Sequence, residues 1–280
     1  IDSGGAPADA QVSIYTAGAQ LAYNAQQYAK AAERAKHALE LGGTAGNLEV
    51  LMLDSYFRAD QVDQGLAEAR RIIAAGEAAG HPAAEDVYSV TARALQERDR
   101  TADLESILLQ RAAAYPTAFN LRTAGLVYLQ NAPENRATSI DIMRMFIAAE
   151  AMSDRRFYLE HVQNLAEDAL PYEATQVIHA ARASGLVQSN DTTFNELATL
   201  QEGKIAEDRA SLPATERRAM TVPDARLATK AGDAYLGYGD YAKAEALYTA
   251  ALGKTGADAD LLNTRIGIAR YDAGNYAGAL

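Results

Sequence analysis

The 280-residue chain contains no cysteine, so disulfide bonds, cysteine nucleophiles and thiolate metal sites are excluded. It also lacks tryptophan, has only 7 prolines, and draws only 7% of its residues from the aromatic types. A β-sandwich would require more β-branched and aromatic residues than this. The hydrophobic share is nevertheless 49%, and much of it consists of alanine and small aliphatic residues. Such a composition is typical of closely packed α-helices.

Positive charge is scarce as well, because 26 Lys and Arg residues stand against 37 Asp and Glu residues and leave a net charge of −11. A nucleic-acid partner is therefore not expected, since phosphate binding requires a basic footprint. No apolar run reaches the roughly 18–20 residues of a membrane span, so we expect no membrane insertion of this segment. The acidic balance is typical of a solvated surface.

The clearest pattern lies in residues 225–252, which read as two short helices joined by a tight turn at 237–240. Gly232 lies inside the first of these helices, where it costs roughly 1 kcal/mol relative to alanine. We therefore expect the partner helix to approach closely at that point. The residues expected to face the neighbouring helices are apolar or small: Leu227, Ala231, Ala234 and Tyr235, then Tyr241, Ala244, Leu247, Tyr248 and Ala251.

This unit recurs along the chain at intervals of 33 to 39 residues. The expected starts are near Val12, Gly46, Glu85, Ala118, Arg155, Asn190, Ala225 and Asp260. A helix–turn–helix unit with a period near 34 residues resembles the tetratricopeptide repeat (TPR). The resemblance implies an all-α fold, an α-solenoid of stacked antiparallel helix pairs that forms a right-handed superhelix.

The organisation along the chain follows from how well each stretch fits the repeat. We expect a disordered polar lead over 1–11 and a TPR-like array over 12–212, whose last unit degenerates into one helix ending near Leu212 and Pro213. The proline-bounded stretch 213–223 is predicted to be a linker. Residues 224–280 are predicted to be a TPR pair that is truncated in its last helix.

A solenoid end needs a capping element. We therefore expect the natural protein to continue past Leu280, and the uncapped end to allow self-association. The chain begins at Ile1 with a polar lead, as a processed exported protein would. This favours a periplasmic location, with a cytoplasmic one as the alternative.

The sequence contains no specific motif for catalysis or for cofactor or metal binding. The run from Gly237 to Ala242 matches the loose dinucleotide fingerprint GxGxxA, but the same turn recurs at 274–276 inside a helical pattern. We therefore interpret it as a repeat turn and expect no cofactor. The four histidines share no metal-ligand spacing, and His161 is expected to be a hydrogen-bonded structural residue. No catalytic residue is predicted.

The TPR resemblance also implies where a partner binds, because the first helices of successive repeats line a groove that takes a peptide or a partner helix. The family's Lys and Asn clamp for a terminal carboxylate is missing here. The outward-facing first-helix residues, which are the expected partner contacts, are Gln20, Tyr23, Asn24, Asp54, Phe57, Arg58, Arg93, Arg122, Gln130, Asp233 and Tyr271.

The sequence therefore predicts a non-enzymatic scaffold that holds a protein or peptide partner. One alternative is the helical stalk of a bacterial envelope or polysaccharide-export assembly, which shares the scaffold chemistry. Another is a glycan-cleaving enzyme of the helical-toroid or muramidase type. The absence of tryptophan counts against the enzyme, because its site would require a carboxylate in an aromatic-lined cleft.

Overall fold

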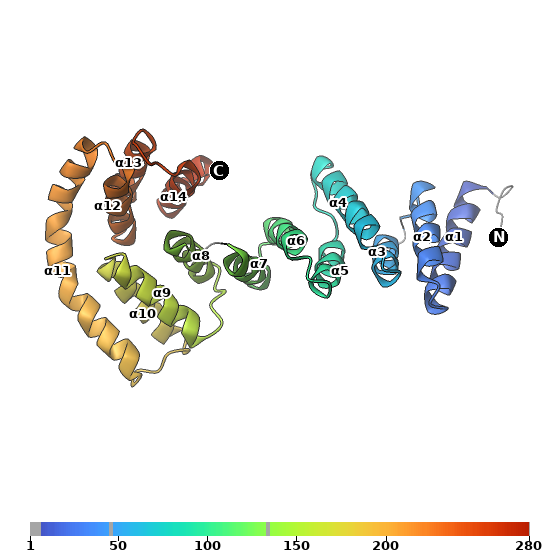
Figure 1. Cartoon of the computed structure of the whole chain (residues 1–280), viewed down its shortest axis with the longest axis horizontal. Coiled ribbons are helices and arrows are strands. Elements are labelled where there is room, and N and C mark those ends of the chain that lie inside the picture. Colours follow the sequence, from blue (N-terminus) through green and yellow to red (C-terminus); the bar gives the residue numbers. More distant parts are fainter. Residues whose placement is uncertain (1–6, 45–46, 133–134, 280) are drawn as a thin grey trace. The chain divides into compact units, whose positions relative to one another are not determined.

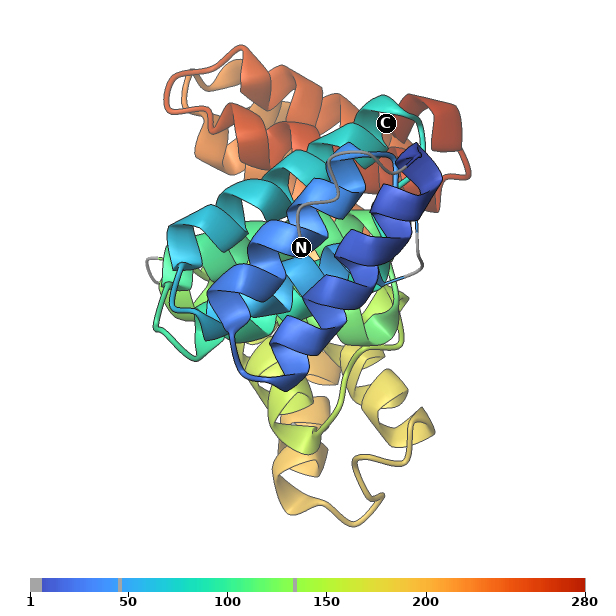
Figure 2. The ribbon, with the colours of Figure 1, turned by 90° about the vertical axis from the view of Figure 1, so that its right-hand side faces the viewer.

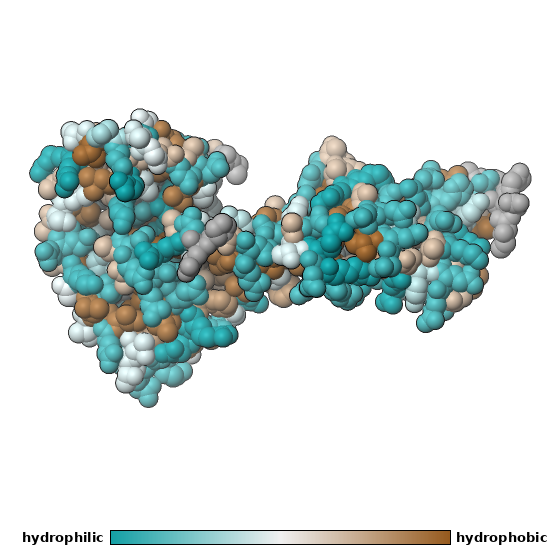
Figure 3. All heavy atoms as spheres, viewed as in Figure 1, coloured by the Kyte–Doolittle hydropathy of each residue, from teal (hydrophilic) through white to brown (hydrophobic). Residues whose placement is uncertain are grey.

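The computed structural model describes residues 7–44, 47–132 and 135–279 of the chain. In these residues there are fifteen α-helices and no β-strand (Figure 1). The chain divides into two compact units, Ile1–Pro133 and Glu134–Leu280. The face of each unit seen in Figure 3 is mainly hydrophilic, in keeping with the net charge.

The first unit holds seven helices that stack in chain order (Figure 1), with each helix packed on its neighbours in sequence. Figure 2 shows α1 and α2, in blue, side by side. The first helices of successive repeats also meet, since α3 packs on α5. The helices are α1 (Ala8–Asn24), α2 (Tyr28–Glu40), α3 (Leu48–Arg58), α4 (Val62–Ala78), α5 (Glu85–Gln96), α6 (Thr101–Ala114) and α7 (Ala118–Asn131).

The second unit holds the remaining helices. Its antiparallel pairs are α9 with α10, α12 with α13, and α14 with the short α15. The helices are α8 (Arg136–Ala148), α9 (Arg155–Glu167), α10 (Pro171–Ala183), α11 (Thr192–Thr221), α12 (Ala225–Gly237), α13 (Tyr241–Leu252), α14 (Ala259–Asp272) and α15 (Tyr276–Ala279). All eight predicted repeat starts lie within four residues of a helix start.

The turn inside the helix pairs has one geometry throughout. The residue two positions before the second helix has a positive φ of 53° to 80° in six pairs; these residues are Gln26, Asp60, Asp99, Ala169, Gly239 and Gly274. The next backbone N–H donates to the carbonyl five residues earlier, as in Asp240 to Tyr235 at 2.9 Å. This is the Schellman arrangement that satisfies the last carbonyls of the first helix. The glycine-rich stretch at 237–240 is therefore a repeat turn, as predicted.

Close helix approach explains the glycines inside the pairs. A Cβ added at Gly232 would lie 2.5 Å from Cε1 of Tyr248, so the tyrosine ring packs directly on the α12 backbone. Gly65 of α4 has the same relation to Phe57 of α3, at 2.7 Å. The close approach predicted at Gly232 is confirmed, and Tyr235 and Tyr248 are buried as expected.

One predicted repeat spans the division between the units. Of the unit expected at Ala118, α7 belongs to the first compact unit and α8 to the second. Ala132, which follows α7, is extended at φ −71° and ψ 149°, as expected for a residue before proline. One predicted boundary is wrong. The predicted linker 213–223 is helical through Thr221.

The expected disordered lead 1–11 is helical from Ala8 onward, where α1 begins. The lead's residues 1–6 lie outside the described residues, as does Leu280.

Candidate functional site

A groove lies across the first helices of the first three repeats. Its larger part has a volume of about 470 Å³, and an adjoining hollow has about 250 Å³. The two share three residues, Asp54, Arg58 and Arg93. We call this surface the α1–α3–α5 groove. The remaining lining residues are Gln20, Tyr23, Asn47, Val50, Leu51, Phe57, Asp86, Ser89, Val90, Ala94, Glu97 and Arg98.

Helical periodicity explains why these residues line one surface. In α5 the lining residues Asp86, Ser89, Val90 and Arg93, followed by Glu97 at the C-cap, are spaced by one, three or four positions that lie on one face of an α-helix. The same spacing relates the lining residues of α3. Because α3 packs on both α1 and α5, the three faces form one continuous surface.

Asp54 is the centre of the polar contacts in the groove. Its carboxylate accepts hydrogen bonds from the Tyr23 hydroxyl at 2.5 Å and from Nε of Arg58 at 2.6 Å, both on Oδ2. Nη2 of Arg93 donates to Oδ1 at 3.2 Å. The Arg58 guanidinium also lies over two rings, 5.6 Å from the centroid of Tyr23 and 5.7 Å from that of Tyr28. These contacts fix the side chains of three helices to one another.

The electrostatics follow from this geometry. Burial acts to raise the pKa of Asp54, but the hydrogen bonds from Tyr23 and Arg58 and the charges of Arg58 and Arg93 outweigh it, so the pKa lies below the ordinary value. Burial and then the hydrogen bond to Asp54 raise the pKa of Tyr23. The carboxylate of Asp54 is therefore ionised at neutral pH, and its oxygens already accept hydrogen bonds from Tyr23, Arg58 and Arg93. The arginines remain 48% and 61% exposed, and they direct donors toward solvent.

Five of the predicted partner-contacting residues line the larger part of this groove: Gln20, Tyr23, Asp54, Arg58 and Arg93. Asn24 is exposed on α1, where its side-chain oxygen accepts a hydrogen bond from Nε2 of Gln20 at 3.2 Å.

Two other predicted partner contacts, Phe57 and Asp233, do not face solvent. Phe57 borders the smaller hollow but is only 3% exposed, because its ring packs on Gly65. Asp233 is 6% exposed and is held by Arg265 and Tyr248. The prediction that both residues face outward is wrong, since each side chain points into the packing between helices.

The remaining predicted contacts lie outside the groove. Arg122 and Gln130 are on α7, where Arg122 is half-buried and Gln130 is exposed. Tyr271 of α14 is 59% exposed and makes an edge contact with Tyr276, with their centroids 5.1 Å apart.

Sequence reasoning missed the apolar floor of the groove. Val50, Leu51 and Val90 lie three or four residues from Asp54 and Arg93, and that helical spacing could have identified them. It also missed Arg265, which is only 2% exposed although it is charged. Its burial could have been predicted from the helical spacing that places it on the same face of α14 as Leu262, Ile266 and Ala269.

His161 is buried in α9, as expected of a structural residue, but neither ring nitrogen has a hydrogen-bond partner among the residues described. The expectation of a hydrogen-bonded histidine is therefore wrong. Within the same residues, no group of three His, Asp or Glu side chains is arranged to hold a metal ion. None of the helices described is long and apolar enough to span a bilayer.

No protein-family model matches the chain, and no curated protein matches it. Among solved structures it is similar to a tetratricopeptide repeat protein from Parabacteroides merdae ATCC 43184, with 13% identity, 92% of this chain and 98% of that one covered, and a TM-score of 0.37. It is also similar to the TPR2AB domain of yeast Sti1 in a pHSP90 complex, with 14% identity, 97% and 99% covered, and a TM-score of 0.36.

A third similar structure is that of Naa15/Naa10 bound to HypK-THB, with 11% identity and a TM-score of 0.42. The match covers 92% of this chain and 38% of that one. The helix pairs with their common turn make this chain a helical-repeat protein, an all-α protein of stacked antiparallel helices.

Proposed function

We propose that the chain is a non-enzymatic scaffold that holds a peptide segment of a protein partner in the α1–α3–α5 groove. The observation that carries this proposal is the convergence of Tyr23, Asp54, Arg58 and Arg93 from three helices on one open hollow. A groove of this kind presents fixed polar groups to an extended chain, and little side-chain ordering remains to be done on binding.

The chemistry of the groove favours a segment that carries a carboxylate beside an aliphatic side chain. Arg58 and Arg93 both pair with the carboxylate of Asp54, so these three side chains together carry one positive charge. The rest of the lining adds Asp86, Glu97 and Arg98. Guanidinium groups held in place in this way suit carboxylates. Val50 and Leu51 supply an apolar floor for the neighbouring side chain. The glycan-cleaving enzyme and the envelope stalk have no comparable observation in the described parts of the chain.

The test uses Arg93→Glu, because Arg93 is 61% exposed and makes only a long contact with Asp54. The full chain is immobilised, retained proteins are identified, and the affinity of the retained partner is measured for each variant. We expect Arg93→Glu to weaken binding at least tenfold, because it replaces attraction for a carboxylate by repulsion.

The matched control is Arg71→Glu, on the second helix α4 of the same unit, where Arg71 is 60% exposed. It should bind the partner as the wild type does. Equal affinities for the wild type and Arg93→Glu, with unchanged helicity, would place the interface elsewhere on the chain.

A further inference from the structure

The second unit contains contacts that join helices far apart in the sequence. Nε of Arg265 in α14 lies 3.1 Å from Oδ2 and 3.3 Å from Oδ1 of Asp141 in α8, 124 residues away. Its Nη2 lies 3.4 Å from the carbonyl oxygen of Ala137, also in α8. In a solenoid each repeat contacts only its neighbours in sequence. Arg265 therefore connects the first full helix of this unit to the last.

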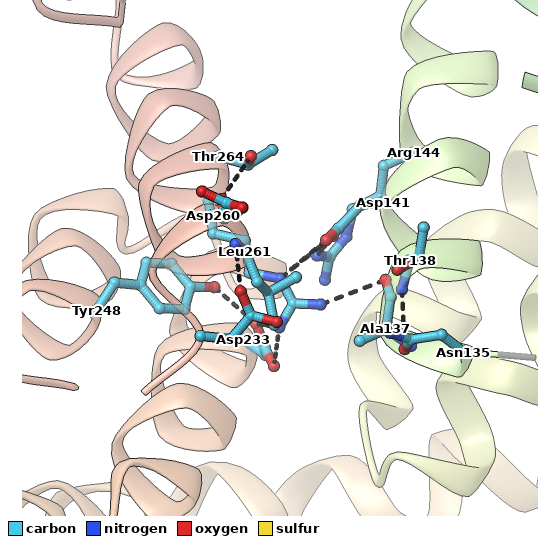
Figure 4. A network of polar contacts seen from close by, with 12 residues as sticks. Asn135, Ala137, Thr138, Asp141, Arg144, Asp233, Tyr248, Asp260, Leu261 and Thr264 are labelled. Atoms are coloured by element: carbon cyan, nitrogen blue, oxygen red, sulfur yellow. Dashed lines mark hydrogen bonds and ion pairs between the residues drawn. The ribbon is translucent and has the colours of Figure 1, made fainter. Parts of the chain in front are cut away.

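A buried ionic cluster surrounds this connection (Figure 4). Nη1 of Arg265 donates to both carboxylate oxygens of Asp233 in α12 at 2.8 Å, and the Tyr248 hydroxyl of α13 donates to the same carboxylate at 2.8 Å. From α8, Arg144 bonds Asp141 at 2.9 Å and Glu173 of α10 at 2.7 Å. We call these residues the Arg265 cluster: Asp141, Arg144, Glu173, Asp233, Tyr248 and Arg265.

The charged side chains of the cluster are 2% to 14% exposed, so water screens them little. Three carboxylates accompany two guanidinium groups. Losing either arginine would leave buried negative charge without compensation, which is strongly unfavourable. The closed arrangement therefore depends on each arginine.

The packing of α8 and α14 follows the order of the chain, unlike the bonds of Arg265. α8 packs on α9, and α14 packs on α13 and α15, so each of the two helices is held by its own neighbours in sequence. In the described part of the second unit, the hydrogen bonds that join α8 to α14 come from one side chain, Arg265. Buried ion pairs are often no more stabilising than apolar residues of the same volume, but they are specific in direction. Breaking this connection would leave both helices folded.

We propose that Arg265 is a latch that holds the second unit closed, and that the unit opens between α8 and α14 when the latch is released. Opening moves α8 away from α14 without unfolding either helix, while α10 and α12, which pack on each other, stay in contact. It transfers the carboxylates of Asp141 and Asp233 from the interior to solvent.

The test exploits the absence of cysteine, because two introduced cysteines are the only sites that a thiol-reactive spin label can reach. The label sites are Ala148→Cys on α8 and Asn263→Cys on α14, both exposed. Double electron–electron resonance then measures the distance between the labels in the full chain. The latch variant is Arg265→Met, which removes the charge and retains apolar volume.

We expect a single narrow distance in the wild-type background. In Arg265→Met this distance should be replaced by a longer and broader distribution, while circular dichroism shows unchanged helicity. The matched control is Arg270→Met. Arg270 lies on the same helix but pairs with Glu245 of the adjacent α13, so its loss should leave the distance as in the wild type.

A milder variant keeps the test decisive if Arg265→Met loses helicity. Asp141→Asn weakens the bond to α8 while Asp233 continues to compensate Arg265. It should lengthen the mean distance in the same direction. A distance unchanged from the wild type in Asp141→Asn, or in a helical Arg265→Met, would overturn the latch.

Discussion

His161 shows how one buried side chain can set the acid sensitivity of a unit. It is fully buried in α9, and no hydrogen-bond partner for its ring nitrogens lies within the described residues. Burial lowers its pKa to about 4; the charge of Glu173 acts against this change, and that of Arg144 adds to it. The imidazole is therefore neutral in the folded protein near pH 7.

We predict that His161→Leu stabilises the second unit, and more at pH 5 than at pH 8. The unfolded histidine titrates near 6.5, so the folded state loses stability as the pH falls from about 6.5 toward 4. At pH 5 this loss is about 2 kcal/mol. Removing an unsatisfied buried polar group adds about 1 kcal/mol at both pH values. Urea unfolding at the two pH values measures both effects.

The exposed His179 of α10 provides the control, since His179→Leu makes the same replacement without removing a buried polar group. Asp233 acts in the opposite sense, because burial raises its pKa to about 6 and its contribution to stability increases as the pH falls through that value. Both proteins in each comparison contain Asp233, so its effect cancels. A His161→Leu protein with the wild-type pH profile would contradict the prediction.

At the scale of the element, α11 shows tertiary contacts overriding a local stop signal. Pro213 lacks an N–H group and clashes with the carbonyl four residues earlier, so the sequence predicts a helix end there. The helix continues to Thr221, and it is curved in Figure 1. Buried Leu212 and Ala219 anchor it on both sides of the proline. The Tyr235 hydroxyl of α12 also donates to Glu216 at 2.6 Å.

We predict that Pro213→Ala raises the free energy of unfolding of the second unit by about 1–3 kcal/mol, because it restores a backbone hydrogen bond and removes the clash. Urea unfolding provides the measurement. Gly203→Ala in the same helix is a reference: no atom lies within 4 Å of its added Cβ, and the gain should be about 1 kcal/mol. Lower stability in Pro213→Ala would mean that packing of α11 requires the bend.

At the scale of the whole molecule, the division at 133 and 134 predicts two independent folding units. The hydrophobic cluster that runs from Ala19 to Ala124 lies entirely within the first unit. We expect fragments 1–133 and 134–280 each to be helical and to unfold cooperatively. Circular dichroism of the separate fragments should sum to that of the full chain. A fragment that stays unfolded alone would show that its core is completed by the other.

The sequence predicted the helix pairs and their starts because each first helix repeats its apolar face at a regular interval. It did not predict the division between residues 133 and 134, because the apolar pattern continues from α7 into α8. Tyr23, Asp54 and Arg93 could be assigned to one groove from their positions in successive first helices. The partner of Asp233 could not be assigned, because Arg265 reaches it through the folded arrangement of α12 and α14.

The six left-handed turns have a consequence for how relatives of this chain can be recognised. The position is occupied by glutamine, aspartate, aspartate, alanine, glycine and glycine in turn, yet its φ stays between 53° and 80°. The six pairs therefore share a backbone torsion angle at this position rather than a residue type. A comparison of residue types finds agreement only between the two glycines and between the two aspartates, whereas a comparison of φ finds agreement among all six turns. Remote relatives of such a chain are better sought by strings of backbone angles than by strings of amino acids.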